Sequence, residues 1–343
     1  MTLYAFIGTY TQTGSDGIYV CRVDPITGVF TQISSAKTPN PTFLALHPNG
    51  RFLYAANELD ADAASVTAYA INPSTAALTE LNQQPTHASA PCHVRVDATS
   101  RWLIAANYGD GDLCVYPIRD DGMIGELTDR VKQTGASPHG HSVTMDAANR
   151  FAFACDLGLD RVFVYRLDLE RGALVPHGEA KLAEGAGPRH FAFHPSGQFA
   201  YVINELNNTM TAFAYDAEHG ALRELQTLST LPTGYIEKSY CADVHVHPSG
   251  KFLYGSNRGH HSIVVFAIDE ATGTLSLVGH QPTGGDWPRN FALHPSANWL
   301  YVANQNSDNI VQFEVNMVSG ALEPTGYEIS LPKPVCIQFL ETQ

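Results

Sequence analysis

The stretch HPNGRFLYAAN (residues 47–57) recurs along the chain about every 49 residues, and this repeat decides the fold. Close copies run from His194 to Asn204, from His247 to Asn257 and from His294 to Asn304, and weaker copies begin at Asp97 and Asp146. A period of this length is typical of radial or stacked repeat folds. The repeat also lets the chain be compared with itself. A residue present in every copy serves the fold, whereas a charged residue present in one copy needs another reason.

Residues 188–231 form one repeat unit, which reads as four short β-strands joined by turns. The apolar residues after Pro188 predict the first strand. The HPSG turn at residues 194–197 follows it, because proline presets φ and glycine permits φ > 0. Three further segments within residues 198–228 are rich in aromatic and β-branched residues or alternate in polarity, which predicts three more strands. Four antiparallel strands per repeat are typical of a propeller blade, and no window shows a sustained helical period.

The two ends of the chain match the two halves of one further blade. Residues 3–8 align with the second strand of a repeat, and residues 334–339 align with the first strand at residues 41–46. The C-terminal segment is therefore expected to supply the innermost strand of a blade whose other three strands come from the N-terminus. Six internal copies plus this split blade predict an all-β, seven-bladed β-propeller whose closure leaves few free strand edges. An open β-solenoid is the structural alternative, and it would need no such match between the ends.

The composition indicates a single domain, residues 1–343, because the unbroken repeat outweighs a prior of about 150 residues per domain. The N-terminus lacks a basic region with a long apolar run, and no segment approaches about 18 apolar residues. Neither a signal peptide nor a transmembrane helix is therefore expected. Six scattered cysteines without a CxxC spacing predict reduced thiols in a cytoplasmic protein. The net charge of −14 argues against nucleic-acid or membrane partners but leaves room for a small anionic substrate.

Two polar positions recur in nearly every copy and are therefore expected to be structural. The first ends the second strand, where an Asn or Asp can cap a turn by bonding to backbone groups. The second is the histidine that precedes the proline of the turn. These residues are Asn57, Asn107, Asp156, Asn204, Asn257 and Asn304, and His47, His194, His247 and His294.

Other positions on one face of the predicted disk vary from blade to blade. The first strand runs into the His-Pro turn and the second runs back, so the start of the first and the end of the second lie at one mouth of the central channel. Buried charges are costly unless they are paired or used, and a pocket with convergent polar groups is the default site. The residues singled out are His141, Arg189, His190, Glu205, Asp243, Arg258 and Arg289, with Glu58, His93 and His245 at neighbouring variable positions. The structural alternative is a set of ion pairs that line a wet channel.

These residue types suit proton transfer and the binding of an anion. His141 and Glu205 can act as general base and acid. Two arginines, Arg189 and Arg258, can fix a carboxylate or phosphate and stabilise a developing oxyanion. The sequence contains no recognisable nucleophile beside a base, no glycine-rich phosphate loop and no zinc-ligand spacing, so no metal or cofactor is expected. The alternative is a metal held by His139, His141, Asp243 and His245.

Several motifs together resemble one known family. They are GAGPRHFAFHP (residues 185–195), VINELN (202–207), GHS (140–142), ADVH (242–245), Asn257-Arg258 and Pro288-Arg289. All are similar to motifs of the seven-bladed propeller lactonases, which include propeller-type bacterial 6-phosphogluconolactonases and the fungal 3-carboxymuconate lactonising enzyme. By motif, the family's functional histidine corresponds to His141, its two arginines to Arg189 and Arg258, and its glutamate to Glu205.

The resemblance implies a cytoplasmic lactonase that hydrolyses a sugar lactone, with 6-phosphogluconolactone the first candidate. His141 would be the general base, the two arginines would hold the anionic group and the oxyanion, and Glu205 would orient an arginine or act as an acid. The residues expected to contact the substrate are His190, Asp243, His245, Arg289, Glu58 and His93. The alternatives are the lactone of an unphosphorylated aldonic, aldaric or hexuronic acid, a muconate-type cyclisation, and a non-catalytic propeller that binds protein partners.

Overall fold

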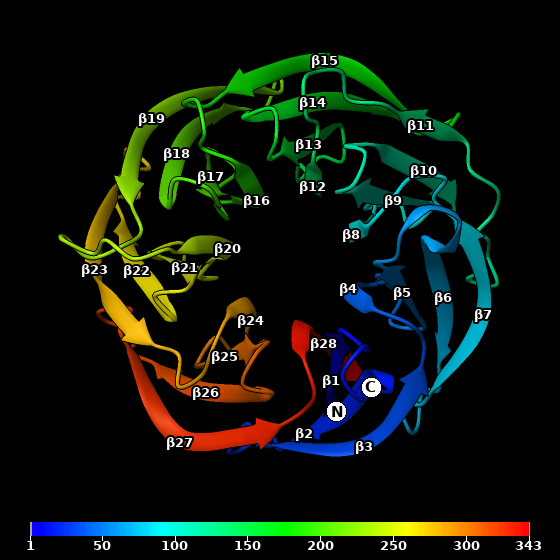
Figure 1. Cartoon of the computed structure of the whole chain (residues 1–343), viewed down its shortest axis with the longest axis horizontal. Helices are drawn as coiled ribbons and strands as arrows, with labels where there is room; N and C mark the ends of the chain where they lie inside the picture. Colours follow the sequence, from blue (N-terminus) through cyan, green and yellow to red (C-terminus); the bar gives the residue numbers. More distant parts are fainter. Residues whose placement is uncertain (1, 343) are drawn as a thin grey trace.

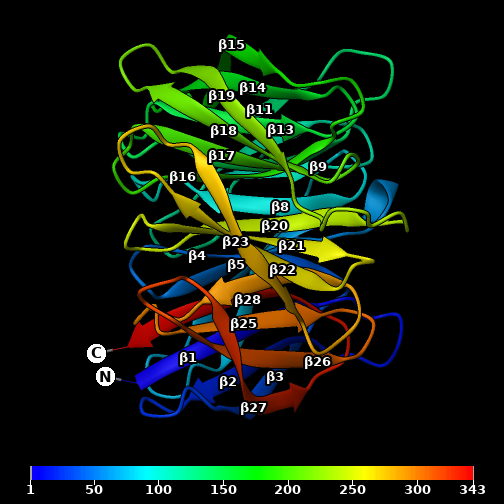
Figure 2. The same ribbon diagram turned by 90° about the vertical axis from the view of Figure 1, so that its left-hand side faces the viewer.

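Seven antiparallel sheets stand around a central axis as the blades of a propeller (Figure 1). The computed structural model describes residues 2–342, and each sheet within them has four strands. The only helical element in this range is the short 3-10 turn η1 (Ala61–Ala63), and no helix there is long and apolar enough to cross a membrane. Figure 2 shows the ring edge-on, with the two termini next to each other. The prediction of an all-β, seven-bladed propeller is confirmed.

The blades are numbered from the one that holds the N-terminus, and each is given from its innermost strand outwards. Blade 1 contains β28 (Pro334–Thr342), β1 (Thr2–Thr9), β2 (Gly17–Val23) and β3 (Phe30–Lys37). Blade 2 contains β4 (Pro41–Leu46), β5 (Phe52–Asn57), β6 (Ser65–Ile71) and β7 (Leu78–Pro85). Blade 3 contains β8 (Pro91–Val96), β9 (Trp102–Asn107), β10 (Leu113–Pro117) and β11 (Asp129–Val131).

The remaining blades follow the same order. Blade 4 contains β12 (Gly140–Met145), β13 (Phe151–Asp156), β14 (Arg161–Asp168) and β15 (Ala173–Lys181). Blade 5 contains β16 (Pro188–Phe193), β17 (Phe199–Asn204), β18 (Thr209–Asp216) and β19 (Ala221–Ser229). Blade 6 contains β20 (Tyr240–Val246), β21 (Phe252–Arg258), β22 (Ser262–Ile268) and β23 (Leu275–Pro282). Blade 7 contains β24 (Pro288–Leu293), β25 (Trp299–Asn304), β26 (Asn309–Val315) and β27 (Leu322–Ser330).

Strand β28 closes the ring by pairing with β1. The two strands are antiparallel, and their register runs from Thr2 opposite Thr342 to Thr9 opposite Pro334. The C-terminal strand is thus the innermost strand of a sheet whose other three strands come from the N-terminus, as expected from the sequence. The open β-solenoid alternative is wrong.

The hydrophobic core is divided into clusters that lie between neighbouring blades. One cluster packs Tyr201 of blade 5 against Leu253 of blade 6, and another packs Tyr301 of blade 7 against Ile7 of blade 1. Both faces of a blade are therefore apolar, and a blade buries them only by contact with its two neighbours. All six cysteines are buried and unpaired within these sheets.

A repeated contact, which we call the aromatic–glycine clasp, joins six of the blades to the next blade. An aromatic ring at the start of the second strand packs against a positive-φ glycine in the turn between the third and fourth strands of the following blade. The pairs are Phe52–Gly122, Trp102–Gly172, Phe151–Gly220, Phe199–Gly273, Phe252–Gly320 and Trp299–Gly28. A Cβ atom on Gly273 would lie 2.3 Å from the Phe199 ring, and the Tyr201 hydroxyl donates to the Gly273 carbonyl at 3.2 Å. These turns need glycine both for its φ angle and for its lack of a side chain.

The repeat-wide polar residues hold turns and blades together. His194 Nε2 lies 2.8 Å from the Gly250 carbonyl oxygen in the next blade, and His247 Nε2 lies 3.2 Å from that of Ala297. At the opposite face, Asn257 Nδ2 donates to the Thr230 carbonyl at 2.9 Å. The structural roles predicted for these positions are confirmed here.

A β-bulge at the start of each first strand positions the residues of the variable face. In blade 5, Pro188 pairs with Asn204 and His190 pairs with Ile203, so Arg189 is an extra residue between the two pairs. The first strands of the other blades carry equivalent irregularities. A bulge redirects side chains and is over-represented beside active sites.

The clasp predicts a large difference between two glycine substitutions. Gly273 and Gly197 have φ angles of +73° and +70°, but nothing lies within 4 Å of a Cβ on Gly197. Gly197→Ala should lower the free energy of unfolding by about 1 kcal/mol, from backbone strain alone. Gly273→Ala should lower it by about 2 kcal/mol more, because the Phe199 ring must move. Urea titration of both variants measures the difference, and equal losses would show that the clasp contributes nothing.

Candidate active site

The bulges divide the variable residues of the first strands into two sets. The bulged residues contribute to the mouth of the channel, and the residues that follow them form what we call the septum ring. The bulged residues are Thr42, Cys92, His141, Arg189, Ala242, Arg289 and Val335. The septum ring is Phe43, His93, Ser142, His190, Asp243, Asn290 and Cys336.

The septum ring closes the channel across its axis. The rings of Phe43 in blade 2 and His190 in blade 5 have centroids 5.9 Å apart, although these blades are three places apart in the ring. The His93 and His190 rings are 5.8 Å apart. The mouth therefore lies on one side of this septum, and a separate cavity lies behind it.

A carboxylate between two buried arginines dominates the mouth. Glu205 Oε2 lies 2.9 Å from Arg189 Nε and 2.7 Å from Arg258 Nη2. Glu205 follows the capped end of β17, and its backbone N–H donates to the Gly187 carbonyl at 2.7 Å. Arg189 and Arg258 are only 2% and 4% exposed. Such burial requires this pairing, because an isolated buried charge is strongly unfavourable.

The charges of this triad are set by burial and by one another. Burial alone would raise the pKa of Glu205, but the charges of Arg258 and Arg189 outweigh burial and lower it. Burial, with repulsion from Arg189, lowers the pKa of Arg258 to about 9, although Glu205 opposes this. At neutral pH the triad is therefore one carboxylate and two guanidinium groups.

A second, looser pair lies beside the first. Arg289 Nη2 is 3.8 Å from Glu58 Oε2, and the Arg289 guanidinium lies over the Tyr10 ring at 5.4 Å from its centroid. Glu58 accepts hydrogen bonds from the Tyr10 hydroxyl at 2.6 Å and from Thr42 Oγ1 at 2.7 Å. Arg289 and Glu58, which the sequence had placed at the same mouth, are brought together in this way.

His141 stands at the mouth as a neutral imidazole. Its ring packs edge-on against Tyr108 and His190, with centroids 5.8 Å and 5.3 Å apart. Its buried Nδ1 atom has no hydrogen-bond partner among residues 2–342. Burial, reinforced by the positive charge of Arg189, holds the pKa of His141 well below its usual value. At neutral pH His141 is therefore unprotonated, which is the form that a general base requires.

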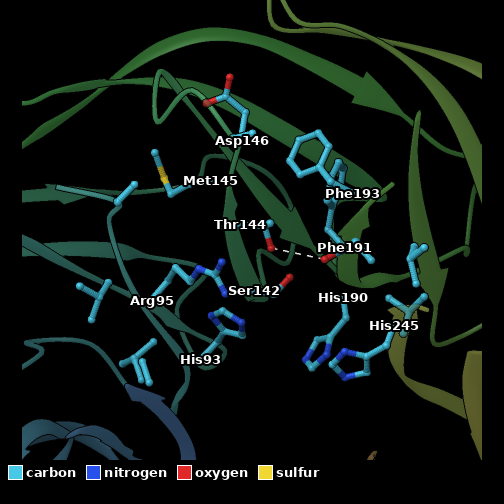
Figure 3. A pocket seen from close by; sticks show the side chains of 18 of the residues that line it. His93, Arg95, Ser142, Thr144, Met145, Asp146, His190, Phe191, Phe193 and His245 are labelled. Carbon is cyan, nitrogen blue, oxygen red and sulfur yellow. Dashed lines mark hydrogen bonds between the residues drawn. The ribbon is translucent and has the colours of Figure 1, made fainter. Parts of the chain in front are cut away.

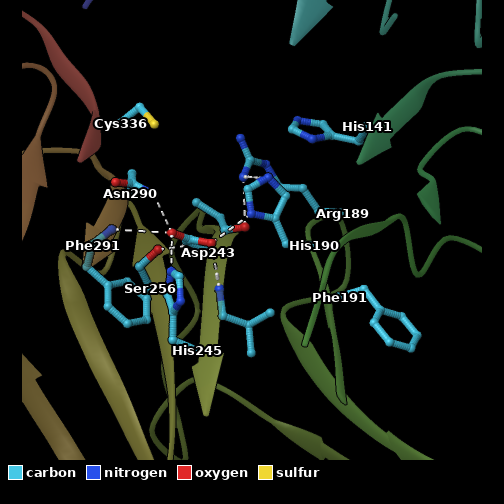
Figure 4. A network of polar contacts seen from close by, with 12 residues as sticks. His141, Arg189, His190, Phe191, Asp243, His245, Ser256, Asn290, Phe291 and Cys336 are labelled. Atoms are coloured by element: carbon cyan, nitrogen blue, oxygen red, sulfur yellow. Dashed lines mark hydrogen bonds and ion pairs between the residues drawn. The ribbon is translucent and has the colours of Figure 1, made fainter. Parts of the chain in front are cut away.

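Asp243 is the hub of a hydrogen-bond network within the septum (Figure 4). Its Oδ1 atom lies 2.7 Å from His190 Nδ1, and its Oδ2 atom lies 3.0 Å from His245 Nε2 and 2.5 Å from Asn290 Nδ2. Burial opposes the charge of Asp243, but His245 and His190 outweigh burial and hold its pKa well below the usual range. Asn290 Oδ1 in turn accepts from the Ile337 N–H of the closing strand at 2.9 Å.

The network reaches the mouth through His190. Arg189 Nη1 lies 3.1 Å from His190 Nε2. Because arginine can only donate, Nε2 accepts and the Nδ1–H group donates to Asp243. Burial and the charge of Arg189 lower the pKa of His190 to about 4, so this ring is neutral. A continuous chain of contacts thus runs from the closing strand to the arginine pair.

The residues expected at one mouth fall into three places. His141, Arg189, Glu205, Arg258, Arg289 and Glu58 lie at the mouth, His93, His190 and Asp243 lie in the septum, and His245 lines the cavity behind it. Sequence reasoning did not select Tyr10, Tyr108, Trp287 or Asn290. Trp287 supports Arg258, whose guanidinium lies 5.3 Å from its ring centroid. Among residues 2–342 no three His, Cys, Asp or Glu side chains are grouped to hold a metal ion. The alternative set that included His139 therefore does not come together.

Comparison with known proteins agrees with the motifs. The sequence profile of the lactonase family with a seven-bladed β-propeller matches residues 4–339. A 6-phosphogluconolactonase of Bacillus subtilis is 36% identical over 349 aligned positions, which cover 99% of each chain. A 6-phosphogluconolactonase of Formosa agariphila is 34% identical over 84% of this chain and 85% of its own. The crystal structure of a periplasmic gluconolactonase of Pseudomonas aeruginosa superposes with a TM-score of 0.95, at 32% identity and with 100% of both chains covered.

The Asp243 hub predicts a pH-dependent loss of stability. Burial opposes the protonation of His245, but Asp243 outweighs burial and raises the pKa of His245. The stability that this pair contributes is present below the ordinary histidine pKa of about 6.5 and is lost as pH rises through the raised value. Because the His245 side chain is 39% exposed, water screens part of this pairing, so Asp243→Asn should lower the free energy of unfolding by about 2 kcal/mol at pH 5.5 and by less at pH 8.5.

Urea unfolding at the two pH values measures this effect. Asp60→Asn is the matched control, because Asp60 is exposed and its side chain forms no hydrogen bond or ion pair with the described residues. A loss of stability for Asp243→Asn that is the same at both pH values would contradict the His245–Asp243 pairing.

Proposed function

Because this chain belongs to the seven-bladed β-propeller lactonase family, we propose that its mouth hydrolyses 6-phosphogluconolactone to 6-phosphogluconate. Relatives of the same length are 6-phosphogluconolactonases, so the chain is a lactone-hydrolysing enzyme, and this substrate would place it in the pentose phosphate pathway. The observation that carries the proposal is the Arg189–Glu205–Arg258 triad beside the neutral His141.

The charge of the mouth favours an anionic substrate. Its three arginines and two glutamates leave a net charge of 3 − 2 = +1, in a chain whose net charge is −14. A positive site with buried walls attracts an anion more strongly than the same charges in open water. An anionic sugar lactone suits this field.

The reaction needs a base, an oxyanion site and a proton donor for the leaving group. In the proposed mechanism, His141 takes a proton from water as the water oxygen bonds to the lactone carbonyl carbon. One guanidinium of the triad stabilises the oxygen that becomes negative in the tetrahedral intermediate. The ring C–O bond then breaks, and the His141 imidazolium returns its proton to the departing ring oxygen, which becomes a hydroxyl group. The product carboxylic acid releases its own proton to solvent.

Glu205 acts through the arginines in this mechanism. Its carboxylate is ionised and engaged with Arg189 and Arg258, so it holds no proton to donate. An ionised carboxylate that contacts both guanidinium groups fixes their orientation before the substrate arrives. The orienting role is therefore favoured over the role of acid.

We propose Arg289 as the group that holds the phosphate. Its partner Glu58 is 3.8 Å away, compared with 2.9 Å and 2.7 Å for the two arginine contacts of Glu205. The Arg289 side chain is also the most open of the three, at 17% exposed. A loosely paired guanidinium can turn towards a phosphate and bind it at two points.

The second candidate substrate is an unphosphorylated gluconolactone. The similar structure from Pseudomonas aeruginosa, that of a periplasmic gluconolactonase, favours this candidate. Because that similar protein is periplasmic, the cytoplasmic location expected from the sequence stays a prediction. No observation favours the muconate-type cyclisation, and the lactonase relatives argue against a non-catalytic propeller.

A lactone panel separates the two substrates. With a pH indicator, kcat/KM for 6-phosphogluconolactone should exceed that for gluconolactone, and Arg289→Gln should lower the first by about tenfold or more. Its effect on gluconolactone should stay within about threefold, which makes the second lactone the internal control. A wild-type preference for gluconolactone, or equal losses on both, would overturn the phosphate assignment but not the hydrolysis.

The proposed base is tested by His141→Ala. A general acid–base group contributes about 10²–10⁴-fold, so kcat on the best lactone should fall by that factor, while the melting temperature changes little. His47→Ala is the control, because His47 lies in the turn at the opposite face and should affect stability but not kcat. Parental kcat in a folded His141→Ala protein would refute the mechanism.

A further inference from the structure

We propose that the cavity behind the septum holds a second binding site, for a small carboxylate or phosphate anion, built around Arg95. This inference does not depend on the proposed lactonase mechanism. The cavity has a volume of about 760 Å³ and extends from the septum to the His-Pro turns, where Pro48, Pro195 and Gly197 line it. This volume lies within the range of about 300–1,000 Å³ that is typical of small-molecule sites.

Arg95 breaks the pattern of the repeat. Side chains alternate along a strand, so the residue two places after each septum residue also faces the channel. These seven residues form one layer behind the septum. These residues are Ala45, Arg95, Thr144, Ala192, His245, Ala292 and Gln338. Arg95 is the one permanent charge in this layer, and three of its neighbours are alanines that leave space across from it. A charge in one blade that the fold does not require in the others indicates a ligand.

The Arg95 guanidinium has no partner. Among residues 2–342 it forms no ion pair or hydrogen bond, whereas the guanidinium groups of Arg189 and Arg258 are both paired. The Arg95 side chain is exposed to the cavity that it lines, and arginine carries its charge at neutral pH. A charged guanidinium that faces open space and has no protein partner can bind an anion at two points.

Two further polar groups lie near Arg95 and have no strong hydrogen-bond partner. Figure 3 shows Arg95, Ser142 and His93 gathered at the septum end of the cavity. Ser142 Oγ and His93 Nδ1 are buried without a hydrogen-bond partner among the described residues. The Cys155 thiol interacts with Ser142, but a thiol is a weak partner. A hydroxyl and a neutral imidazole beside a guanidinium are suitable donors for the oxygens of a carboxylate or phosphate.

The acidic residues of the cavity are already engaged. Asp97 accepts from the backbone N–H groups of Arg101 and Trp102, and Asp146 accepts from those of Arg150 and Phe151. Both carboxylate oxygens of Asp243 are engaged by the side chains of His190, His245 and Asn290. None of these carboxylates forms an ion pair with Arg95, so its charge remains available.

The septum separates this site from the mouth. The cavity is lined by His93, His190 and Asp243 but by none of the mouth arginines. His190 contacts both compartments, since it lines the cavity and bonds to Arg189. The two proposed anion sites therefore lie on opposite sides of the septum. An experiment must distinguish an anion bound in the cavity from one bound at the mouth.

The test compares wild type, Arg95→Gln and Arg223→Gln. Arg223 is exposed on the outer strand β19 and forms no ion pair within the described part of the chain, so its variant matches the change of charge. Isothermal titration with inorganic phosphate, and separately with citrate, is run at constant ionic strength. Wild type and Arg223→Gln should show a binding event that weakens at least about tenfold in Arg95→Gln. The better of the two probes identifies the site as one for phosphoryl or for carboxylate groups. Lactone hydrolysis by Arg95→Gln should remain at the wild-type rate, which also verifies its fold.

Crystals of the wild-type protein soaked in selenate locate the anion directly. An anomalous peak within hydrogen-bond distance of the Arg95 guanidinium supports the proposal, and this experiment decides even if Arg95→Gln does not fold. Selenate at Arg189, Arg258 or Arg289 alone, or identical isotherms for wild type and Arg95→Gln, would overturn it.

Discussion

The structure depends on the closure of the ring. Each blade is apolar on both faces, so a blade at an open end would expose a whole face of side chains to water. The pairing of β28 with β1 removes that open end, because blade 1 is completed only when the last segment of the chain arrives. The clasps also make each blade depend on its neighbour. In the outer part of the propeller, an aromatic side chain of one blade fills the space left by a glycine of the next. Strand order, core and channel all follow from this circular arrangement.

Much of the fold could be predicted from the sequence, because the copies of the repeat can be aligned with one another. The HPNG-type turns located the first and second strands, and the matching ends revealed the split blade. The site was only partly predictable. Arg189 and His190 are adjacent in sequence, yet a bulge places one at the mouth and the other in the septum, and a single sequence carries no signal for a bulge of this kind. Tyr10 follows β1 at the position that Glu58 and Glu205 occupy in their blades, but this position was compared only among the six internal copies. Arg95 was visible as a blade-specific charge but was overlooked, because only the starts of the first strands were compared.

The mouth also shows how an acidic protein can treat an anion as its substrate. Net charge acts at long range and is screened within about 8–10 Å at physiological salt, whereas the triad acts at hydrogen-bond distance. Burial strengthens the field of Arg189 and Arg258 and keeps His141 unprotonated. The same low-dielectric surroundings therefore provide an acceptor for protons and a binding site for negative charge, two properties that conflict in water.

The link from Ile337 through Asn290 to Asp243 has a consequence for how the protein matures. Ile337 belongs to the last strand of the chain, and Asp243 orients His190, which contacts Arg189. During synthesis, the arginine pair is complete in sequence long before this final strand leaves the ribosome. A nascent or truncated chain that lacks the strand also lacks the last anchor of the hub. The orientation of Arg189 therefore depends, through His190 and Asp243, on a strand from the far end of the chain.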